Sequence, residues 1–182
     1  MPLSPVNIIG DVTHTLELLL DDLTPSLVSP ADLTLGENES ARINIFLYQA
    51  LENPFGKNRN WRTRPAGDQE YPPLALSLYY LLTPYAIDEL TAHHVLGDAM
   101  RILHDNAILR GAQLAESLRQ VVAQLAIALM PLGLEELTRI WNSLQSAYQL
   151  SVAYEVRVVL VSSIQERTPS RVLTKVDIYS QI

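Results

Sequence analysis

The 182-residue chain contains no cysteine, which excludes disulfides, thiolate metal ligands and a thiol nucleophile. Charged residues are also scarce, at 18% against an average of about 25%, so relatively little of the surface can be charged. Low surface charge is common among subunits of assemblies, although ordinary monomers show it too. With 48% hydrophobic residues, a chain of this length fits one domain with a substantial core.

The sequence has no apolar run long enough to cross a bilayer, which takes about 20 residues. The longest apolar stretch, residues 121–134, is interrupted by Gln124 and Pro131. The first residues, MPLSPVNIIGD, lack the basic start and the continuous apolar run of a secretion signal. We therefore expect a protein that is made and kept in the cytoplasm, without a membrane span.

Residues 1–41 contain no lysine or arginine but seven carboxylates. These are Asp11, Glu17, Asp21, Asp22, Asp32, Glu37 and Glu39. By contrast, four of the thirteen basic residues fall within residues 57–64. The formal net charge of −7 argues against general nucleic-acid binding. Two interpretations stay open: the acidic and basic regions meet across a subunit boundary, or both are solvated surfaces.

The basic stretch KNRNWRTR, residues 57–64, is the most conspicuous candidate surface. Arginine and tryptophan can stack on bases, but they are also enriched at protein interfaces, and the acidic chain favours the second interpretation. A charged loop without a partner is the remaining alternative. The candidate interface residues are Lys57, Arg59, Trp61, Arg62 and Arg64.

Motifs for phosphate binding, dinucleotide binding or a serine nucleophile are missing. His94 and Asp98 share a polar stripe of a predicted helix, but two ligands fall short of the three or four of a zinc site. His93 and His104 lie about 16 Å apart along that helix and cannot share an ion. We interpret the stripe as a solvated ladder and expect no metal, no cofactor and no catalytic residue. A small enzyme that uses His94 and Asp98 is kept as an alternative.

Hydrophobic periodicity predicts helices and strands in irregular order. Helical spacing covers 9–23, 88–106 and 134–144, and strand alternation covers 42–51, 74–82 and 151–161. Residues 24–40 are rich in turns with a candidate strand at 33–35, residues 52–73 form a polar segment without regular structure, and residues 121–129 fit a strand or a helix. The order predicts a single α+β domain, residues 1–166, with a mostly antiparallel or mixed sheet and flanking helices.

Two of these elements have a predicted buried face. In the strand at 42–51, one face carries Ile43, Ile45, Leu47 and Leu51. In the helix at 134–144, the inward stripe carries Leu134, Leu137, Trp141 and Leu144.

The C-terminal residues 167–182 form a predicted arm. After a Thr-Pro-Ser break, one side of an alternating segment carries Val172, Thr174, Val176 and Ile178. An extended segment gains hydrogen bonds when it adds to an exposed sheet edge. That edge belongs either to its own domain or to a neighbouring subunit, and the second is our hypothesis.

Three stretches of the sequence form a recognisable series. They are RINIFLYQALENPFGKNRNW at 42–61, PLALSLYYLLTPYA at 73–86 leading into HHVLGDAMRILHDN at 93–106, and LGLEELTRIWNSLQSAYQLSVAYEVRVVLV at 132–161. The third is the most specific, because a helix with Leu-x-x-x-Trp leads to a strand with Tyr-Glu-Val-Arg. Together they resemble the cap, or tail-terminator, family of extracellular contractile injection systems of the antifeeding-prophage and virulence-cassette type.

The resemblance implies a structural protein with a tail-terminator-like fold. Family members form a ring, expected to be hexameric, that sits on the last inner-tube ring and the last sheath ring. The implied partners are other copies of the chain, the inner-tube protein and the sheath protein. The resemblance implies a strand at 121–129, supplies no catalytic residue, and places the assembled protein in a phage-tail-like particle. A neck or baseplate component of such a particle is an alternative.

Overall fold

The computed structural model describes residues 7–36, 40–53, 62–63, 69–70, 75–158 and 166–167. In these ranges the α-helices are α1 (Ile8–Leu19), α3 (Glu89–Asp105) and α4 (Leu134–Ser143). The strands are β1 (Arg42–Glu52), β2 (Arg62–Thr63), β3 (Gln69–Glu70), β4 (Leu76–Tyr85), β5 (Ile108–Leu109), β6 (Leu125–Met130), β7 (Val152–Val158) and β8 (Glu166–Arg167). Short 3-10 helices lie at η1 (Asp21–Leu23), η2 (Gly111–Gln113) and η3 (Glu116–Leu118).

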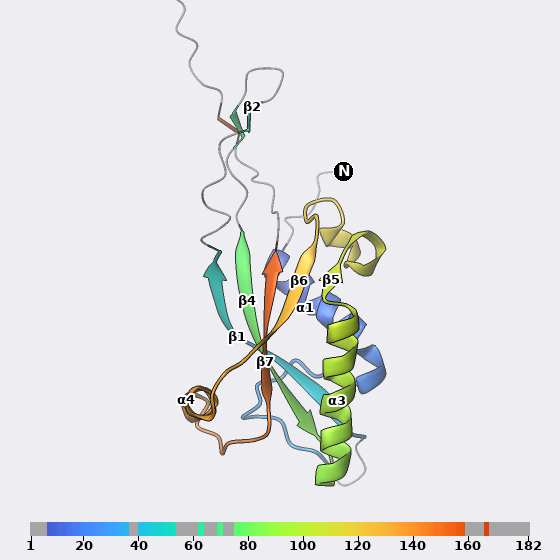
Figure 1. Cartoon of the computed structure of the whole chain (residues 1–182), viewed down its shortest axis with the longest axis vertical. Coiled ribbons are helices and arrows are strands. Elements are labelled where there is room, and N and C mark those ends of the chain that lie inside the picture. Colours follow the sequence, from blue (N-terminus) through green and yellow to red (C-terminus); the bar gives the residue numbers. More distant parts are fainter. Residues whose placement is uncertain are drawn as a thin grey trace, which may run out of the picture.

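Five strands form one antiparallel sheet in the order β1-β4-β7-β6-β5 (Figure 1). β4 and β7 pair along seven residues, from Leu76 opposite Val158 to Leu82 opposite Val152. A second, three-stranded sheet has the order β2-β3-β8. The predicted fold class, an antiparallel sheet with flanking helices, is confirmed.

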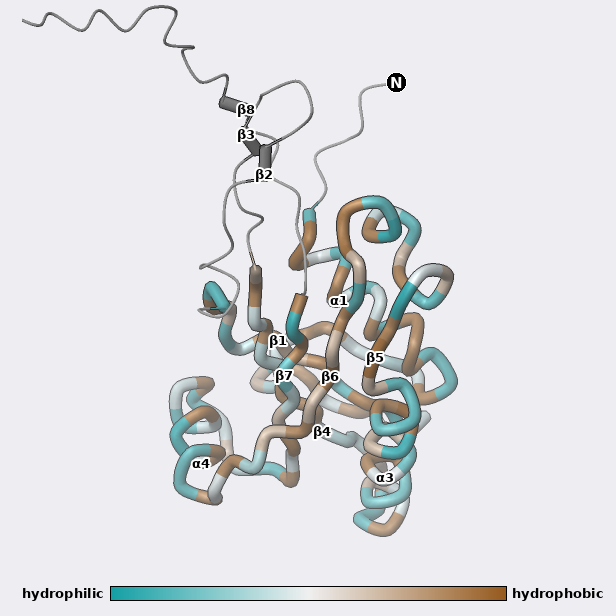
Figure 2. The backbone as a smooth tube through the Cα atoms, turned by 45° about the horizontal axis from the view of Figure 1, so that its top comes forward, coloured by the Kyte–Doolittle hydropathy of each residue, from teal (hydrophilic) through white to brown (hydrophobic). Residues whose placement is uncertain are grey.

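α1 and α3 lie on one face of the five-stranded sheet and α4 on the other (Figures 1 and 2), and each face has its own core. On one face, Leu78, Tyr80 and Leu82 of β4 belong to the cluster that includes the buried side chains of α1 and α3. On the other face, Leu81 packs with Leu137 and Trp141 of α4. Because successive side chains of a strand point to opposite faces, the alternation within β4 divides the two cores.

α1 forms where the sequence predicts a helix. The Asn7 side chain caps it by accepting a hydrogen bond from the Gly10 N–H at 3.3 Å. Val12, Leu16 and Leu20 follow helical spacing and are buried. The helix ends at Leu19, and η1 continues as a 3-10 turn before Pro25.

A β-bulge in β1 changes the predicted face of Leu51. The register shifts between Leu47 and Gln49, so that Ile45 lies opposite Leu82 but Leu51 lies opposite Ser77. One extra residue moves every later side chain to the other face. Leu51 therefore does not share the buried face of Ile43 and Ile45, and it is 46% exposed.

In α4 the predicted inward stripe holds except at Leu134. Trp141 is fully buried, and Leu137 and Leu144 pack in the same cluster. Leu134, the first helical residue, is 67% exposed, and Leu132 from the preceding loop packs against the cluster instead.

Three further sequence-based predictions are corrected. Residues 33–35 contain no strand, and Ser26 makes the bridge to Asn44 of β1 instead. The strand that the resemblance implies within 121–129 does form, but it begins only at Leu125, after a turn that follows η3. The 52–73 insertion contains β2 and β3, so those residues have regular structure. None of the described helices is long and apolar enough to span a membrane.

Candidate interaction surfaces

The two predicted interaction sites fall mostly outside the described residues. The predicted interface residues that lie outside the described ranges are Lys57, Arg59, Trp61, Arg64, Val172, Thr174, Val176 and Ile178. Arg62 opens β2, which pairs with β3, and β3 pairs in turn with β8. The residues that lead into the predicted arm therefore pair with the insertion of their own chain. The interface roles of both sites remain predictions.

The polar stripe of α3 is a solvent-exposed ladder. Arg101 lies 3.4 Å from Asp98 and 3.7 Å from Asp105, and all three side chains are more than half exposed. His94 is exposed and makes no hydrogen bond or ion pair with any described residue. Within the described ranges no three His, Asp or Glu side chains gather as a metal ion requires. This geometry agrees with the interpretation of the stripe as a solvated face.

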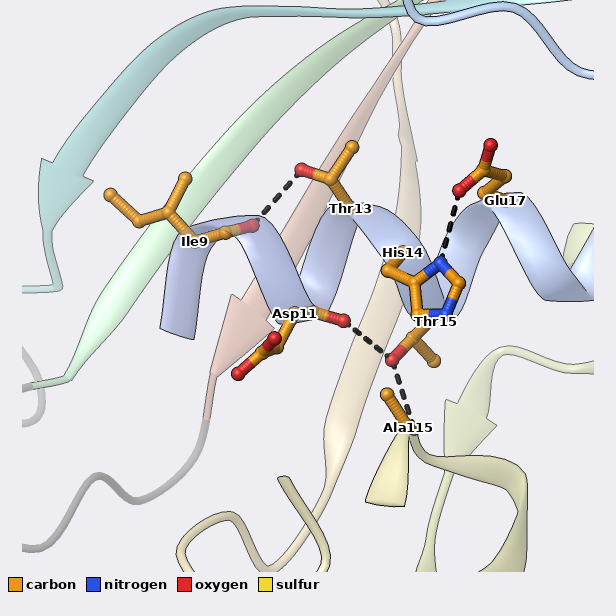
Figure 3. A network of polar contacts seen from close by, with 7 residues as sticks. All are labelled: Ile9, Asp11, Thr13, His14, Thr15, Glu17 and Ala115. Carbon is orange, nitrogen blue, oxygen red and sulfur yellow. Dashed lines mark hydrogen bonds and ion pairs between the residues drawn. The ribbon is translucent and has the colours of Figure 1, made fainter. Parts of the chain in front are cut away.

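The inner side of α1 is tied to the segment between η2 and η3 (Figure 3). The Thr15 hydroxyl donates to the Asp11 carbonyl at 2.8 Å and accepts a hydrogen bond from the Ala115 N–H at 3.1 Å. Thr15 is 1% exposed, so this bond satisfies a buried backbone donor. The contact ties α1 to this segment.

The carboxylates of the acidic N-terminal region are described except for Glu37 and Glu39, and part of this region lies on the outward side of α1. His14 Nδ1 lies 3.0 Å from Glu17 Oε2, and Leu18 is 56% exposed between two shallow hollows. Asp21 and Asp22 follow a last helical turn that holds no basic residue. Carboxylates are unfavourable at this end of a helix dipole, so the surface suits a cationic partner.

A groove of about 790 Å³, here called the β4-end groove, opens where β4 ends. It is lined by residues from three segments, 33–35, 84–92 and 148–150. Tyr85 lines it and donates its hydroxyl to the Pro30 carbonyl at 3.1 Å, which holds the first segment against β4. Burial raises the pKa of Tyr85 to about 12, so the phenol stays protonated and continues to donate.

Large apolar side chains remain exposed around the β4-end groove, namely Ile87 (76%), Leu90 (65%), Tyr148 (44%) and Leu150 (43%). The groove also has an acidic end. Asp88 caps α3 by accepting hydrogen bonds from the Thr91 hydroxyl at 2.7 Å and the Thr91 N–H at 2.9 Å. These bonds lower the pKa of Asp88 and keep it ionised. Glu89 follows it, and among the described residues no Lys, Arg or His lines the groove.

Sequence reasoning missed the β4-end groove, although one signal was available. An apolar residue that precedes a helix N-cap usually packs against the fourth helical residue, in a hydrophobic staple. Ile87 precedes the N-cap Asp88, but the fourth helical residue is Ala92, which is too small to cover it. Tyr148 and Leu150 lie in an irregular segment, where periodicity gives no indication of their environment.

The fold defines the chain as a single α+β domain with a core on each face of its five-stranded sheet. A family model for the Pvc16 N-terminal domain matches residues 11–175, and the chain belongs to this family. The predicted relationship to the cap proteins is thereby confirmed.

Two solved structures are similar along nearly the whole chain. One is the PVC sheath/tube terminator of an extracellular contractile injection system in its extended state, at 21% identity and a TM-score of 0.60, with 98% of this chain and 65% of that chain covered. The other is the tube-terminating cap of the anti-feeding prophage, at 20% identity and a TM-score of 0.56, with 96% and 62% covered. The chain thus spans less than two thirds of either structure. No curated protein matches it.

Proposed function

We propose that this chain is the domain of a cap protein that ends the tube and the sheath of an extracellular contractile injection particle. The family match over residues 11–175 carries the proposal, and the two similar structures are described as a sheath/tube terminator and as a tube-terminating cap. The function is mechanical: the domain covers the last tube ring, stops tube growth and holds the sheath end to the tube. It involves no catalysed reaction. Assembly takes place in the cytoplasm, and the domain then stays in the particle.

The cap acts as a ring, for which we propose six subunits. A closed ring needs two different, complementary surfaces on each subunit, because the same head-to-tail contact repeats around the axis. The acidic outward side of α1 and the basic stretch 57–64 are candidates for these surfaces or for the contact with the tube protein.

Electron microscopy of the purified protein, alone and with tube subunits, tests the proposal. We expect rings from the protein alone and tubes that carry a ring at one end. A monomer that leaves the length distribution of the tubes unchanged would contradict the proposal. In assembled particles, density at the baseplate end would favour a baseplate component instead.

The basic stretch is expected to matter for assembly and little for folding. Arg59, Arg62 and Arg64 can be changed together to glutamine. The melting temperature should stay almost unchanged, whereas ring formation or tube binding should weaken. The defect should be smaller at high salt, because screening reduces the contribution of these charges in the wild type as well. Normal capping by the triple variant at low salt would show that the stretch is only a solvated loop.

The C-terminal arm is proposed to add as a strand to a neighbouring cap or sheath subunit. The alternation of residues 172–179 supports this, and so does the described sheet, in which β1 is an edge strand. Deleting residues 168–182 should leave a folded subunit by circular dichroism but reduce ring stability or sheath attachment. If the truncated chain unfolds, the arm belongs to its own core.

A further inference from the structure

The β4-end groove combines features that select one kind of occupant. Its lining is both apolar and acidic, with Asp88 and Glu89 at the start of α3. Two irregular segments, 33–35 and 148–150, line it together with the end of β4 and the first turns of α3. Ile87 projects at 76% exposure without a staple partner. Such a groove fits an extended segment in which a large apolar side chain stands beside Lys or Arg.

The chain itself contains such a segment. In residues 57–64, Trp61 stands between Arg59 and Arg62, and four of the thirteen basic residues of the chain are in this stretch. Arginine and tryptophan are also the residue types that most often dominate binding energy at protein interfaces.

The groove and the basic stretch are attached at opposite ends of the sheet. The 52–73 insertion begins where β1 ends and returns to the start of β4, where the Asn53 N–H donates to the Ala75 carbonyl at 2.8 Å. The groove lies at the other end of β4, near Tyr85. Ten residues of strand place these ends about 30 Å apart. A contact between the two sites of different copies would be head to tail, which is the kind of contact that closes a ring.

We propose that the β4-end groove receives residues 57–64 of a second copy of this chain, with Trp61 among the exposed apolar side chains and an arginine beside Glu89. The groove suits this segment better than α1, because α1 exposes only Leu18 and, less fully, Ile9 among its described large apolar side chains. This inference rests on the proposed ring and assigns its repeating contact. The acidic side of α1 is then available to the tube or the sheath.

Exchange of charges tests the pairing. Glu89→Arg and Arg62→Glu should each weaken ring formation at low salt, and the double variant should recover it. Glu116→Arg is the matched control, since it reverses an exposed carboxylate that lies outside the groove. Association should weaken roughly threefold to tenfold in each single variant, as expected for the loss of one exposed ion pair and its replacement by repulsion. If the double variant assembles no better than the single variant that assembles more poorly, Glu89 and Arg62 do not pair across the contact.

The apolar part of the contact is tested by Ile87→Asp. Because Ile87 is largely exposed, the melting temperature should not change, whereas association should fall by roughly tenfold or more. Leu134→Asp is the control, because Leu134 is 67% exposed at the first position of α4, where a carboxylate suits the helix dipole. Equal assembly of Ile87→Asp and wild type would overturn the proposal.

A labelled peptide of residues 57–64 separates this inference from the proposed ring. The peptide should bind the wild-type protein, bind Ile87→Asp and Glu89→Arg more weakly, and compete with ring formation. If the wild type forms no ring but the peptide binds in this pattern, the ring fails and the docking site stands. If rings form, the peptide does not bind and the groove variants assemble normally, the docking site fails and the ring stands. If Glu89→Arg leaves rings intact but stops capping, the groove receives a tube or sheath segment and the assignment to a second copy is wrong.

Discussion

Among the described residues, α1 and α3 cover a cluster of twenty buried side chains on one face of the five-stranded sheet, whereas α4 buries a cluster of three, Leu81, Leu137 and Trp141, on the other. In the first cluster the packing is distributed over many side chains of moderate size. In the second it depends mainly on the indole ring of Trp141. At the margin of this small cluster the second face carries the partly exposed Tyr48, which packs against the cluster, and Tyr79, whose ring centroid lies 6.3 Å from that of Tyr48.

This difference separates two tasks within one sheet. The face under α1 and α3 holds the subunit together, since burial of apolar surface is the dominant favourable contribution to folding. The face under α4 is only partly covered, and it presents polar and aromatic groups of the strands to solvent. Four substitutions test this division, from the largest expected effect to the smallest.

Replacing Trp141 with alanine should have the largest effect. Trp141 is fully buried, and its indole N–H donates to the Ser151 hydroxyl at 3.1 Å. Loss of a buried tryptophan costs about 3–5 kcal/mol, out of a stability of roughly 5–15 kcal/mol. We expect insoluble or partly folded protein, and in any soluble fraction hydrogen exchange should be faster in α4 than in α3.

Trp141→Phe is the control for this prediction. It keeps an aromatic ring in the cluster and removes the hydrogen bond to Ser151, so it should cost clearly less than alanine. A thermal melt of Trp141→Ala that matches wild type would show that the second face does not depend on this ring.

The same comparison shows what sequence reasoning can and cannot reach. Burial of Trp141 could be predicted, because helical spacing alone selects that position. The bulge in β1 could not, because it depends on how β1 aligns with β4 in space, and Leu51 was therefore assigned to the wrong face. Leu132 replaces Leu134 in the small cluster for a similar reason: loop residues have no periodicity.

Pro84 illustrates a third limit. The sequence predicts a strand at 74–82, and a proline two residues further on cannot donate to a ladder. In the structure β4 continues to Tyr85. Pro84 lies opposite Ile43, whose carbonyl accepts from the Ser26 N–H at 2.9 Å and so points away from β4. The missing N–H of Pro84 therefore leaves no acceptor of β1 unpaired.

For the candidate surfaces, composition indicated the basic stretch, whereas the β4-end groove forms from three segments that are distant in the sequence.

The second largest effect is expected at Thr15, on the face under α1. Thr15→Val removes the oxygen that accepts from the buried Ala115 N–H and keeps the shape of the side chain. A buried donor without a partner costs about 1–3 kcal/mol. Thr15→Ser, which keeps the hydroxyl, should lose less. Denaturant unfolding compares the two, and equal stability would show that this hydrogen bond does not hold α1 in place.

A third, pH-dependent effect is expected at Tyr80 in the large cluster. Burial raises its pKa to about 12, against a partly offsetting hydrogen bond with Thr13. Above pH 10 the unfolded chain releases this proton and the folded chain keeps it. The stabilising contribution of Tyr80 is therefore fully present below pH 10. It is lost as the pH rises to about 12, which lowers the free energy of unfolding by about 2 kcal/mol. Tyr80→Phe should reduce the alkaline loss in unfolding experiments between these pH values. An unchanged pH dependence would mean that Tyr80 does not contribute to it.

The smallest effect, and the only one of opposite sign, is expected at Thr83 on the face of α4. Thr83 is fully buried opposite Asn44, and its hydroxyl finds no hydrogen-bond partner among the described residues. Burial of an unpaired hydroxyl is unfavourable, so Thr83→Val, which keeps the shape and removes the polar atom, should raise the free energy of unfolding by about 1 kcal/mol. Asn44 must be left intact, since its side-chain amide donates to the Ser26 and Val28 carbonyls at 3.2 and 2.8 Å. Thr83→Ser is the control and should not be stabilising, because it keeps the hydroxyl and loses a methyl group. If Thr83→Val is instead destabilising, the hydroxyl of Thr83 has a hydrogen-bond partner in the wild type, and the prediction is wrong.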